Sequence, residues 1–192
     1  MVQQVYTSCL YVNLELLVPY VTSELKRASR VDLVWDVCLK DSLKMTAREN
    51  RGTGARRRVL SNVKLSSYWK NFLRNDDSKD ELFQFLANAS VSQDNGDKVI
   101  FLTIHKSVVS SNPVVNLDGL QPCSHEEADT GILLHNKGCH ESGYKEAIIR
   151  TTDTDIVVPA VAYLQDLETI GNLWIAFWHG ERSQCSTLLC TV

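Results

Sequence analysis

The chain has 192 residues, with 20 basic and 23 acidic side chains and a formal net charge of −3. This length is enough for one domain with a buried core, and the apolar runs are far shorter than the ~20 residues that cross a bilayer. Six cysteines without a leading charged-then-apolar segment indicate a reducing compartment rather than a disulfide framework. We therefore expect one soluble intracellular domain, nuclear or cytoplasmic, that does not span a membrane.

Charge is unevenly distributed along the chain. Residues 40–64 hold eight basic side chains and two acids, so this segment carries a net charge of +6 and the remainder −9. A basic segment in the same chain as an acidic site suits a polyanionic substrate, and a solvated loop explains the segment about equally well. The candidate phosphate-binding side chains are Lys40, Lys44, Arg48, Arg56, Arg57 and Arg58.

The N-terminal half predicts mainly helices around one buried strand. Apolar residues recur at helical spacing in residues 12–26, although Pro19 weakens this helix, and residues 31–35 form a short apolar strand. A loop rich in glycine and arginine is expected at residues 52–58. Ser78 is the expected N-cap of a later helix. The further helices of this half are predicted at residues 38–51, 66–74 and 78–88.

The C-terminal half alternates strands and helices. A turn at residues 94–97 leads into an apolar strand at 98–105, and residues 107–122 read as a loop without regular structure. A capping box from Ser124 to Glu127 starts the next helix, which glycines close. The closing glycines are Gly138 and Gly143, and the later elements are a strand at 146–151, a helix at 155–167 and a strand at 173–177. This alternation predicts the α/β class, with a mostly parallel sheet and helices on both faces.

Acidic side chains lie where several of these elements begin or end. Asp36 follows the first strand, Asp153 and Asp155 follow the strand at 146–151, and Glu127 and Asp129 start a helix. Because the carboxyl ends of parallel strands share one edge of a sheet, we expect these side chains to gather there. Hard oxygen ligands of this kind favour Mg²⁺ or Mn²⁺, and two such ions can drive phosphodiester hydrolysis. The five carboxylates are therefore the candidate metal-ligating and catalytic residues.

Each acidic group also has an ordinary structural explanation. Acids at a helix N-terminus stabilise the helix dipole, and an Asp-Thr-Asp sequence can cap a helix. The coincidence of three such groups favours the metal site over these explanations. Glu126 is the candidate for an outer-shell partner.

At these residues the chain resembles the PIN and flap-endonuclease superfamily of metal-dependent nucleases. The Val-Trp-Asp at residues 34–36 is similar to the strand-ending aspartate of that family. The Glu-Ala-Asp at 127–129 is similar to its Glu-Ala-Glu helix start, and residues 153–158 are similar to its Asp-x-Asp followed by an apolar helix. This resemblance implies a PIN-like, Rossmann-like three-layer fold, bound Mg²⁺ or Mn²⁺ and a nucleic-acid substrate, either DNA or RNA.

A closer resemblance extends over nearly the whole chain as far as Phe177. It is to a group of uncharacterised animal proteins, often associated with mobile elements, that carry a PIN-like domain. The resemblance implies a single PIN-like domain at residues 1–177, with a basic loop at about 40–64 and a divergent tail at 178–192. The stretches that carry it are 29–36, 40–44, 56–59, 69–74, 124–130, 150–158 and 173–177.

The chain departs from the family pattern in several places. Residues 1–11 contain no acid where the family's opening strand carries an aspartate, so one metal ligand is expected to be missing. Gly131 replaces an arginine, and Pro159 replaces a leucine inside the last helix, where it would break a hydrogen bond. The residues after 177 no longer match, so the chain is expected to be a fragment, incomplete at both ends.

These departures leave a non-enzymatic alternative open. In this alternative the chain is a degenerate, non-catalytic PIN-like fold that binds nucleic acid through residues 40–64, or binds a protein partner. Tyr68 and Trp69 could stack on bases, although their helical spacing is more typical of core residues.

A zinc site is a second alternative. Soft or borderline ligands lie within 18 residues, at Cys123, His125, His135, Cys139 and His140. Their spacing is not that of a standard zinc finger, and two of them, His135 and Cys139, share one helical face. Side chains on such a face are more often buried in the protein than bound to zinc.

Overall fold

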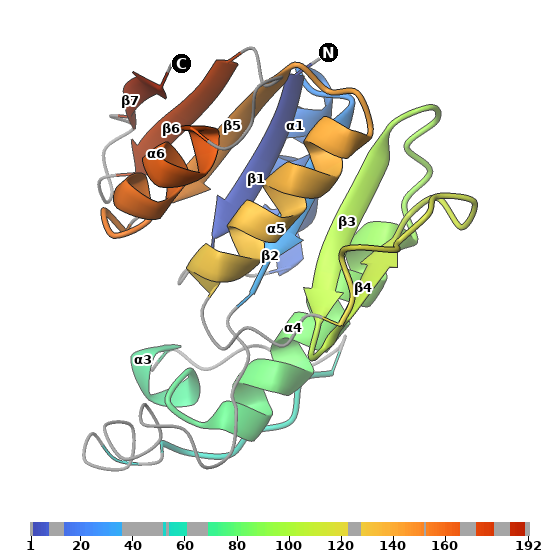
Figure 1. Cartoon of the computed structure of the whole chain (residues 1–192). Helices are drawn as coiled ribbons and strands as arrows, with labels where there is room; N and C mark the ends of the chain where they lie inside the picture. Colours follow the sequence, from blue (N-terminus) through green and yellow to red (C-terminus); the bar gives the residue numbers. More distant parts are fainter. Residues whose placement is uncertain are drawn as a thin grey trace.

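The computed structural model in Figure 1 describes residues 2–7, 14–35, 52, 54–60, 69–122, 128–151, 153–165, 172–178 and 185–190. Within these residues, seven strands form one sheet in the order β4-β3-β2-β1-β5-β6-β7. Helices pack against both faces of this sheet, so the domain belongs to the α/β class.

The sheet is mixed, with four parallel and two antiparallel pairings. Its parallel strands are β1 (Val2–Thr7), β2 (Arg30–Val34), β3 (Val99–Ile104), β5 (Glu146–Thr151) and β6 (Asn172–Trp178). The two edges are antiparallel strands, β4 (Ser107–Ser110) beside β3 and β7 (Cys185–Cys190) beside β6. The central strand β1 pairs with β2 on one side and with β5 on the other.

Alternate side chains of the strands face different helices. On β2, Leu33 belongs to a core cluster with residues of α1 and α4, whereas Val34 belongs to a cluster with residues of α5 and α6. This alternation follows from the two-residue period of a strand. The helices are α1 (Leu14–Leu25), α3 (Trp69–Phe72), α4 (Asp76–Val91), α5 (Ala128–Glu141) and α6 (Val157–Gln165).

Most of the predicted elements that fall within the described residues are confirmed, with ends that differ by a few residues. The predictions at 12–26, 31–35, 78–88, 98–105, 146–151, 155–167 and 173–177 correspond to α1, β2, α4, β3, β5, α6 and β6. The helix predicted at 38–51 lies outside the described residues. Of the helix predicted at 66–74, the described part is helical at Trp69–Phe72. The stretch predicted as a tail contributes β7.

The prediction of an unstructured loop at residues 107–122 is wrong at its beginning. Ser107–Ser110 forms β4, which pairs with β3 through a turn of only two residues, His105 and Lys106. His105 takes a positive φ of 52° in this turn, a conformation usually left to glycine or asparagine. The hairpin was missed because its turn lacks those residues and because serines flank the two valines of the strand.

Helix α4 begins earlier than Ser78, which was the predicted N-cap. The cap is Asn75, whose side-chain oxygen accepts a hydrogen bond from the Ser78 backbone N–H at 2.9 Å. Asp76 and Asp77 then occupy the first turn, where acids stabilise the helix dipole. Asparagine caps a helix as well as serine does, so the earlier start gains a turn without losing the cap.

Two of the predicted helix-ending or helix-breaking residues have other roles. Gly138 lies inside α5, where an added Cβ would meet Leu120 Cδ2 at 2.7 Å, and the helix instead closes at Gly143, with φ of 84°. Pro159 lies in the first turn of α6 because this helix begins at Val157. Its missing N–H would have no partner within the helix there, so the predicted loss of a hydrogen bond to Asp155 is wrong.

No helix among the described residues is both long enough and apolar enough to cross a membrane.

Candidate functional site

The carboxyl edge of the parallel strands is the natural place for a ligand in this topology. The chain passes from β1 to β2 and β3 on one side, and β5 and β6 lie on the other side of β1. The strand order therefore reverses between β1 and β5. In open α/β sheets, ligands bind outside the carboxyl ends of the strands at such a reversal.

Asp153 and Asp155 lie in an ordered turn at this edge, directly after β5. The Asp153 backbone N–H donates to Thr151 Oγ1 at 2.9 Å, and the Asp155 N–H donates to Asp153 Oδ1 at 2.9 Å. Both aspartates are exposed to solvent. The turn therefore exposes both aspartates to solvent, just before α6 begins. It also satisfies backbone groups ahead of that helix, which is the ordinary structural role of such a turn.

The other predicted ligands are only partly covered by the described residues. Asp129 lies half-buried in the first turn of α5, a helix that contacts β1, β2 and β5. Asp36, Glu127 and the outer-shell candidate Glu126 fall outside the described residues, although Asp36 and Glu127 are adjacent to described positions. Over the described ranges, no three His, Cys, Asp or Glu side chains lie close enough together to hold a metal ion. The structure thus brings Asp153 and Asp155 together and adds no third described ligand to them.

The described part of the basic segment packs against the start of α4. Val59 is buried in the same core cluster as residues of α1 and α4. Ser78 Oγ accepts a hydrogen bond from the Arg57 N–H at 3.0 Å, and Arg56 forms a 2.7 Å ion pair with Glu81. Arg56, Arg57 and Arg58 are all exposed, whereas Lys40, Lys44 and Arg48 lie outside the described residues. The arginines are therefore carried by an anchored segment, which sequence alone did not indicate.

Gly54 makes this close packing possible. It has φ of 65°, and a Cβ at this position would meet the backbone oxygen of Asn71 and, at 2.9 Å, the Cβ of Arg74. Glycine adopts positive φ without strain and has no side chain to clash. Gly54 thus has a packing role, in addition to the predicted turn.

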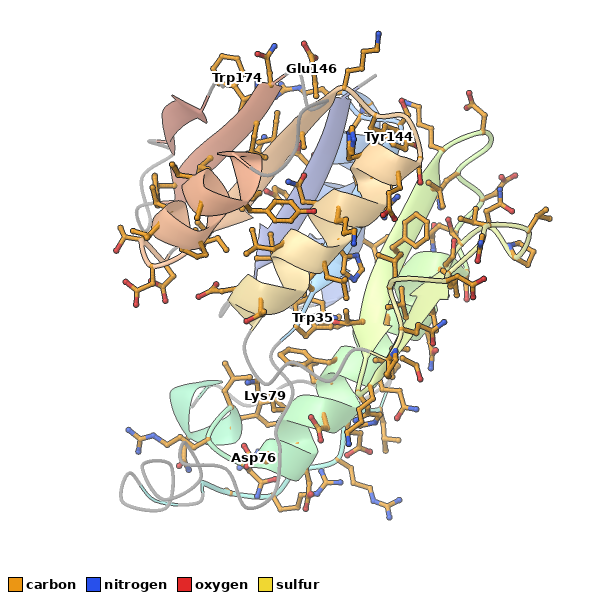
Figure 2. The ribbon with its side chains drawn as sticks, in the orientation of Figure 1. Trp35, Asp76, Lys79, Tyr144, Glu146 and Trp174 are labelled. Carbon is orange, nitrogen blue, oxygen red and sulfur yellow. The ribbon has the colours of Figure 1, made fainter. Side chains whose placement is uncertain are left out.

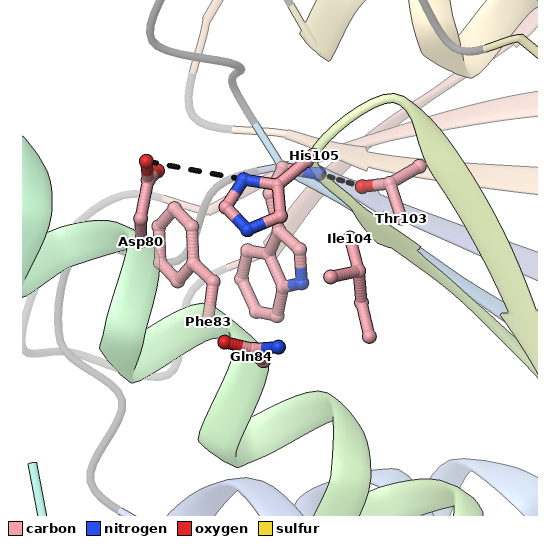
Figure 3. Close-up of a pocket in the computed structure, with 7 residues that line it drawn as sticks. Asp80, Phe83, Gln84, Thr103, Ile104 and His105 are labelled. Atoms are coloured by element: carbon pink, nitrogen blue, oxygen red, sulfur yellow. Dashed lines mark hydrogen bonds and ion pairs between the residues drawn. The ribbon is translucent and has the colours of Figure 1, made fainter.

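A small pocket lies between the start of α4 and the carboxyl ends of β2 and β3. Figure 3 shows several of its lining residues, which are Trp35, Asp80, Phe83, Gln84, Thr103, Ile104 and His105. The Trp35 and Phe83 rings stack with centroids 4.5 Å apart, and His105 Nδ1 lies 3.9 Å from Asp80 Oδ2. Burial raises the pKa of Asp80, and nearby His105 and Lys79 partly oppose this shift. The cavity has a volume of about 10 Å³, room for one water molecule.

This pocket also shows where the basic segment lies. Asp80 and Phe83 come from the N-terminal part of α4, and Ile104 comes from the carboxyl end of β3. The start of α4, with residues 54–60 packed on it, is therefore at the same edge of the sheet as the ends of the parallel strands. In Figure 2 this region occupies the lower part of the view, where Asp76, Lys79 and Trp35 are labelled.

Comparison with protein-family models, with curated proteins and with solved structures finds no match to this chain. Its function must therefore be inferred from its own geometry.

A buried network that we call the polar lock (Arg30, Asp32 and His135) joins β2 to α5. Arg30 Nε and Nη2 donate to the two carboxylate oxygens of Asp32, each at 2.8 Å, and His135 Nδ1 lies 2.8 Å from Asp32 Oδ2. The exposed fraction of these residues is 2% for Arg30 and 0% for Asp32 and His135. Such complete burial of charged groups is rare unless they are paired, as they are here.

The surroundings of the polar lock favour the ionised forms of Arg30 and Asp32. The Arg30 guanidinium lies over the Phe101 ring, 4.0 Å from its centroid. Burial on its own would raise the pKa of Asp32, but the Arg30 charge and the bond from His135 lower it below the ordinary value. Cys139 Sγ lies 4.0 Å from Asp32 Oδ2. The thiol, like the imidazole, is buried at the interface between α5 and the sheet.

Sequence reasoning did not identify this network as a unit. His135 and Cys139 were expected on one buried helical face, and both are buried as expected. The remaining signal was the Arg-x-Asp at residues 30–32, because charges two positions apart in a buried strand must share a face. Their partner lies 103 residues away from Asp32 in the chain, so no local pattern could connect them.

Proposed function

We propose that this chain is a PIN-like, divalent-metal-dependent nuclease domain that hydrolyses phosphodiester bonds of nucleic acid. The observation that carries the proposal is the position of Asp153 and Asp155. Both follow β5 at its carboxyl end, next to β1, where the strand order reverses. Two exposed carboxylates at that position fit a cation site better than a solubilising role, which any surface position could serve.

The chemistry of the donor set fits Mg²⁺ or Mn²⁺, because these ions prefer hard oxygen ligands. The residues proposed to hold the ions are Asp36, Glu127, Asp129, Asp153 and Asp155. Bound ions would supply a nucleophilic water and stabilise the leaving oxygen of a phosphodiester. The protein's own contribution would be to hold the carboxylates in place, since neighbouring like charges repel one another without a cation.

The basic segment supports a polyanionic substrate. Residues 54–60 are anchored at the start of α4, on the same edge of the sheet as the turn after β5. Arg57 and Arg58 are exposed there and can contact phosphates without first folding the segment. An anchored arginine loses less conformational freedom on binding than one on a mobile loop.

The arrangement of the parallel strands is also consistent with the proposal. Five parallel strands lie in the order β3-β2-β1-β5-β6, with α1 and α4 on one face and α5 and α6 on the other. The three-layer fold that the PIN-like resemblance implies is part of this proposal, and the arrangement of these elements supports it. Many unrelated functions use such layered folds, so the fold supports the proposal less strongly than the acidic edge does.

One observation favours the non-catalytic alternative. The central strand β1 has the sequence Val-Gln-Gln-Val-Tyr-Thr and so brings no acid to the reversal point. A family that places an aspartate there would lose one ligand in this chain. The alternative is a degenerate fold that binds nucleic acid, or a protein partner, without cutting.

The test is cleavage of end-labelled single-stranded and flapped DNA and RNA in the presence of Mn²⁺. The wild type is compared with a variant carrying Asp153→Asn and Asp155→Asn, in which asparagine keeps the acceptor oxygen of the turn. We expect cleavage by the wild type and its loss in the variant. A matched control carries Asp94→Asn and Asp97→Asn, two exposed acids that precede β3 at the opposite edge, and it should cleave as the wild type does.

The outcomes separate the two candidate functions. Cleavage that survives the double substitution would contradict the proposed site. A folded wild type that binds the labelled strands but does not cut them, with binding insensitive to divalent metal, would establish the alternative. Binding should then weaken as salt rises, because phosphate contacts release counterions.

A further inference from the structure

The polar lock joins β2 to α5, the helix that carries the proposed ligand Asp129 in its first turn. Strand β2 ends at Val34, and two residues later the chain reaches Asp36. Helix α5 begins at Ala128, directly after Glu127, and carries Asp129 in its first turn. Asp32 lies on the first of these elements and His135 on the second. The position of Asp129 therefore depends on where α5 lies along β2.

A second contact fixes the same helix on the same strand. Gly131 of α5 faces Val34, and an added Cβ at this glycine would meet Val34 Cγ1 at 2.9 Å. Gly131, His135 and Cys139 are spaced four residues apart, so they form one stripe along the helix. The stripe meets β2 at Val34 through Gly131 and at Asp32 through His135. Because these two contacts lie at different positions along β2, they determine both the position and the rotation of α5.

The polar contact is the more selective of the two. Apolar side chains at a helix–sheet interface can repack around a small shift of the helix. A buried carboxylate cannot, because a displaced α5 would leave Asp32 with an unmet acceptor position and His135 with a second buried ring nitrogen unpaired. His135 Nε2 already has no hydrogen-bond partner within the described part of the chain. The buried Asp32–His135 pair therefore opposes displacement of α5 more strongly than apolar packing does.

We propose that Asp32 and His135 are positioning residues, which fix α5 on β2 and thereby hold Asp129, in the first turn of α5, at the carboxyl edge of the sheet. This inference rests on the proposed function for the role of that edge. The position of the helix itself does not depend on it.

The test replaces His135 in three ways. His135→Asn places an amide nitrogen close to where Nδ1 lies and keeps a donor for Asp32. His135→Gln moves the amide toward the Nε2 position and loses that donor, and His135→Leu removes the polar group. The control is His140→Leu, a partly exposed position on the same helix. All variants are studied at a temperature where circular dichroism and urea titration show them folded.

The first readout is the Mn²⁺ dissociation constant, measured by electron paramagnetic resonance without substrate. His135→Gln and His135→Leu should weaken Mn²⁺ binding roughly tenfold or more, as loss of a supporting hydrogen bond does at other metal sites. His135→Asn should restore binding to within about threefold of the wild type, and His140→Leu should have no effect. A folded His135→Gln variant with wild-type Mn²⁺ affinity would overturn the proposal. If His135→Leu does not fold, the His135→Gln variant alone provides this test.

The second readout is amide hydrogen exchange of α5, which needs no metal. Faster exchange in His135→Gln, restored in His135→Asn, supports the positioning role, and unchanged exchange in both variants overturns it. If the wild type binds no Mn²⁺, the metal-dependent function fails, and this second readout alone decides whether the lock positions the helix. The failure of the proposed function and the failure of this inference are thus separately visible.

Discussion

The aspartate of β2 and the two aspartates that follow β5 have opposite surroundings. Asp32 on β2 is fully buried, bonded to Arg30 through both oxygens and close to His135. Asp153 and Asp155, which follow β5, are exposed and have hydrogen bonds mainly within their own turn. In the first arrangement, both carboxylate oxygens make buried contacts that stabilise the fold. The second leaves carboxylate oxygens facing solvent, where a cation or a substrate can reach them. Burial and pairing, more than the residue type, separate structural acids from candidate functional ones.

The sharpest test of this contrast makes one substitution in both places. Asp32→Asn should lower the free energy of unfolding by about 3–5 kcal/mol, because it leaves the buried Arg30 charge without a counter-ion. Asp153→Asn should change it by about 0.5 kcal/mol or less, because the site is exposed and asparagine keeps the acceptor of the turn. Urea unfolding followed by circular dichroism measures both. Equal effects at the two positions would contradict the distinction.

The difference in stability between the wild type and Asp32→Asn is expected to depend on pH. The folded-state pKa of Asp32 is lowered, so its ionised form stabilises the fold above the ordinary pKa of about 4. This stabilisation is lost as the pH falls below that value. The stability difference between the wild type and Asp32→Asn should therefore be constant near neutrality and shrink below about pH 4.

A smaller effect is expected where α5 approaches β2 most closely. Gly131→Ala places a Cβ against Val34, a branched side chain with little freedom to move, and overpacking of this kind costs about 1–3 kcal/mol. Alanine's better helix propensity offsets about 1 kcal/mol of this, so the expected net loss is about 0–2 kcal/mol. A double-mutant cycle with Val34→Ala should show the two substitutions to be coupled. Strict additivity would show that the helix simply moves away.

The smallest effect is expected at Asp80, whose pKa is shifted in the direction opposite to that of Asp32. Burial raises the pKa of Asp80, so its ionised form is disfavoured in the folded protein. The stability that protonation of Asp80 provides is complete below the ordinary pKa and is lost as the pH rises through the raised value. Asp80→Asn should therefore slightly raise the melting temperature at neutral pH and have no effect below about pH 4. A difference that does not vary with pH would point to packing instead of charge.

The sequence predicts the apolar parallel strands well, because β2, β3, β5 and β6 are short runs of branched and aromatic residues between turn signals. It does not single out β1 from its own residues, since Val2–Thr7 carries two glutamines in place of an apolar run. Periodicity also could not find β4, which is only four residues long and bounded by serines. Short or polar strands are recognised only by what they pair with, and pairing is not a local property.

The candidate site also has features that the sequence predicts and features that it does not. The acids after β5 were predictable, because a carboxylate after an apolar run is a local pattern, and the structure describes them where the strand ends. The anchoring of residues 54–60 was not predictable, because it depends on Ser78 and Glu81 in a helix about twenty positions away. The polar lock was not predictable for the same reason, because Asp32 and His135 are 103 residues apart in the chain. Sequence patterns indicate which residues could act, and tertiary contacts decide which of them are free to do so.

The central position of β1 has a consequence for synthesis of the chain. This strand is synthesised before either of its partners and can pair with β2 when β2 follows, but its other neighbour is β5. At ribosomal speeds of about 5–20 residues per second, the intervening residues take on the order of 10 s to appear. Throughout that interval one edge of β1 has no partner, and an open edge readily pairs with other chains. The nascent protein is therefore most prone to aggregation before Glu146–Thr151 emerges, and a chaperone that shields this edge should raise the yield of folded protein.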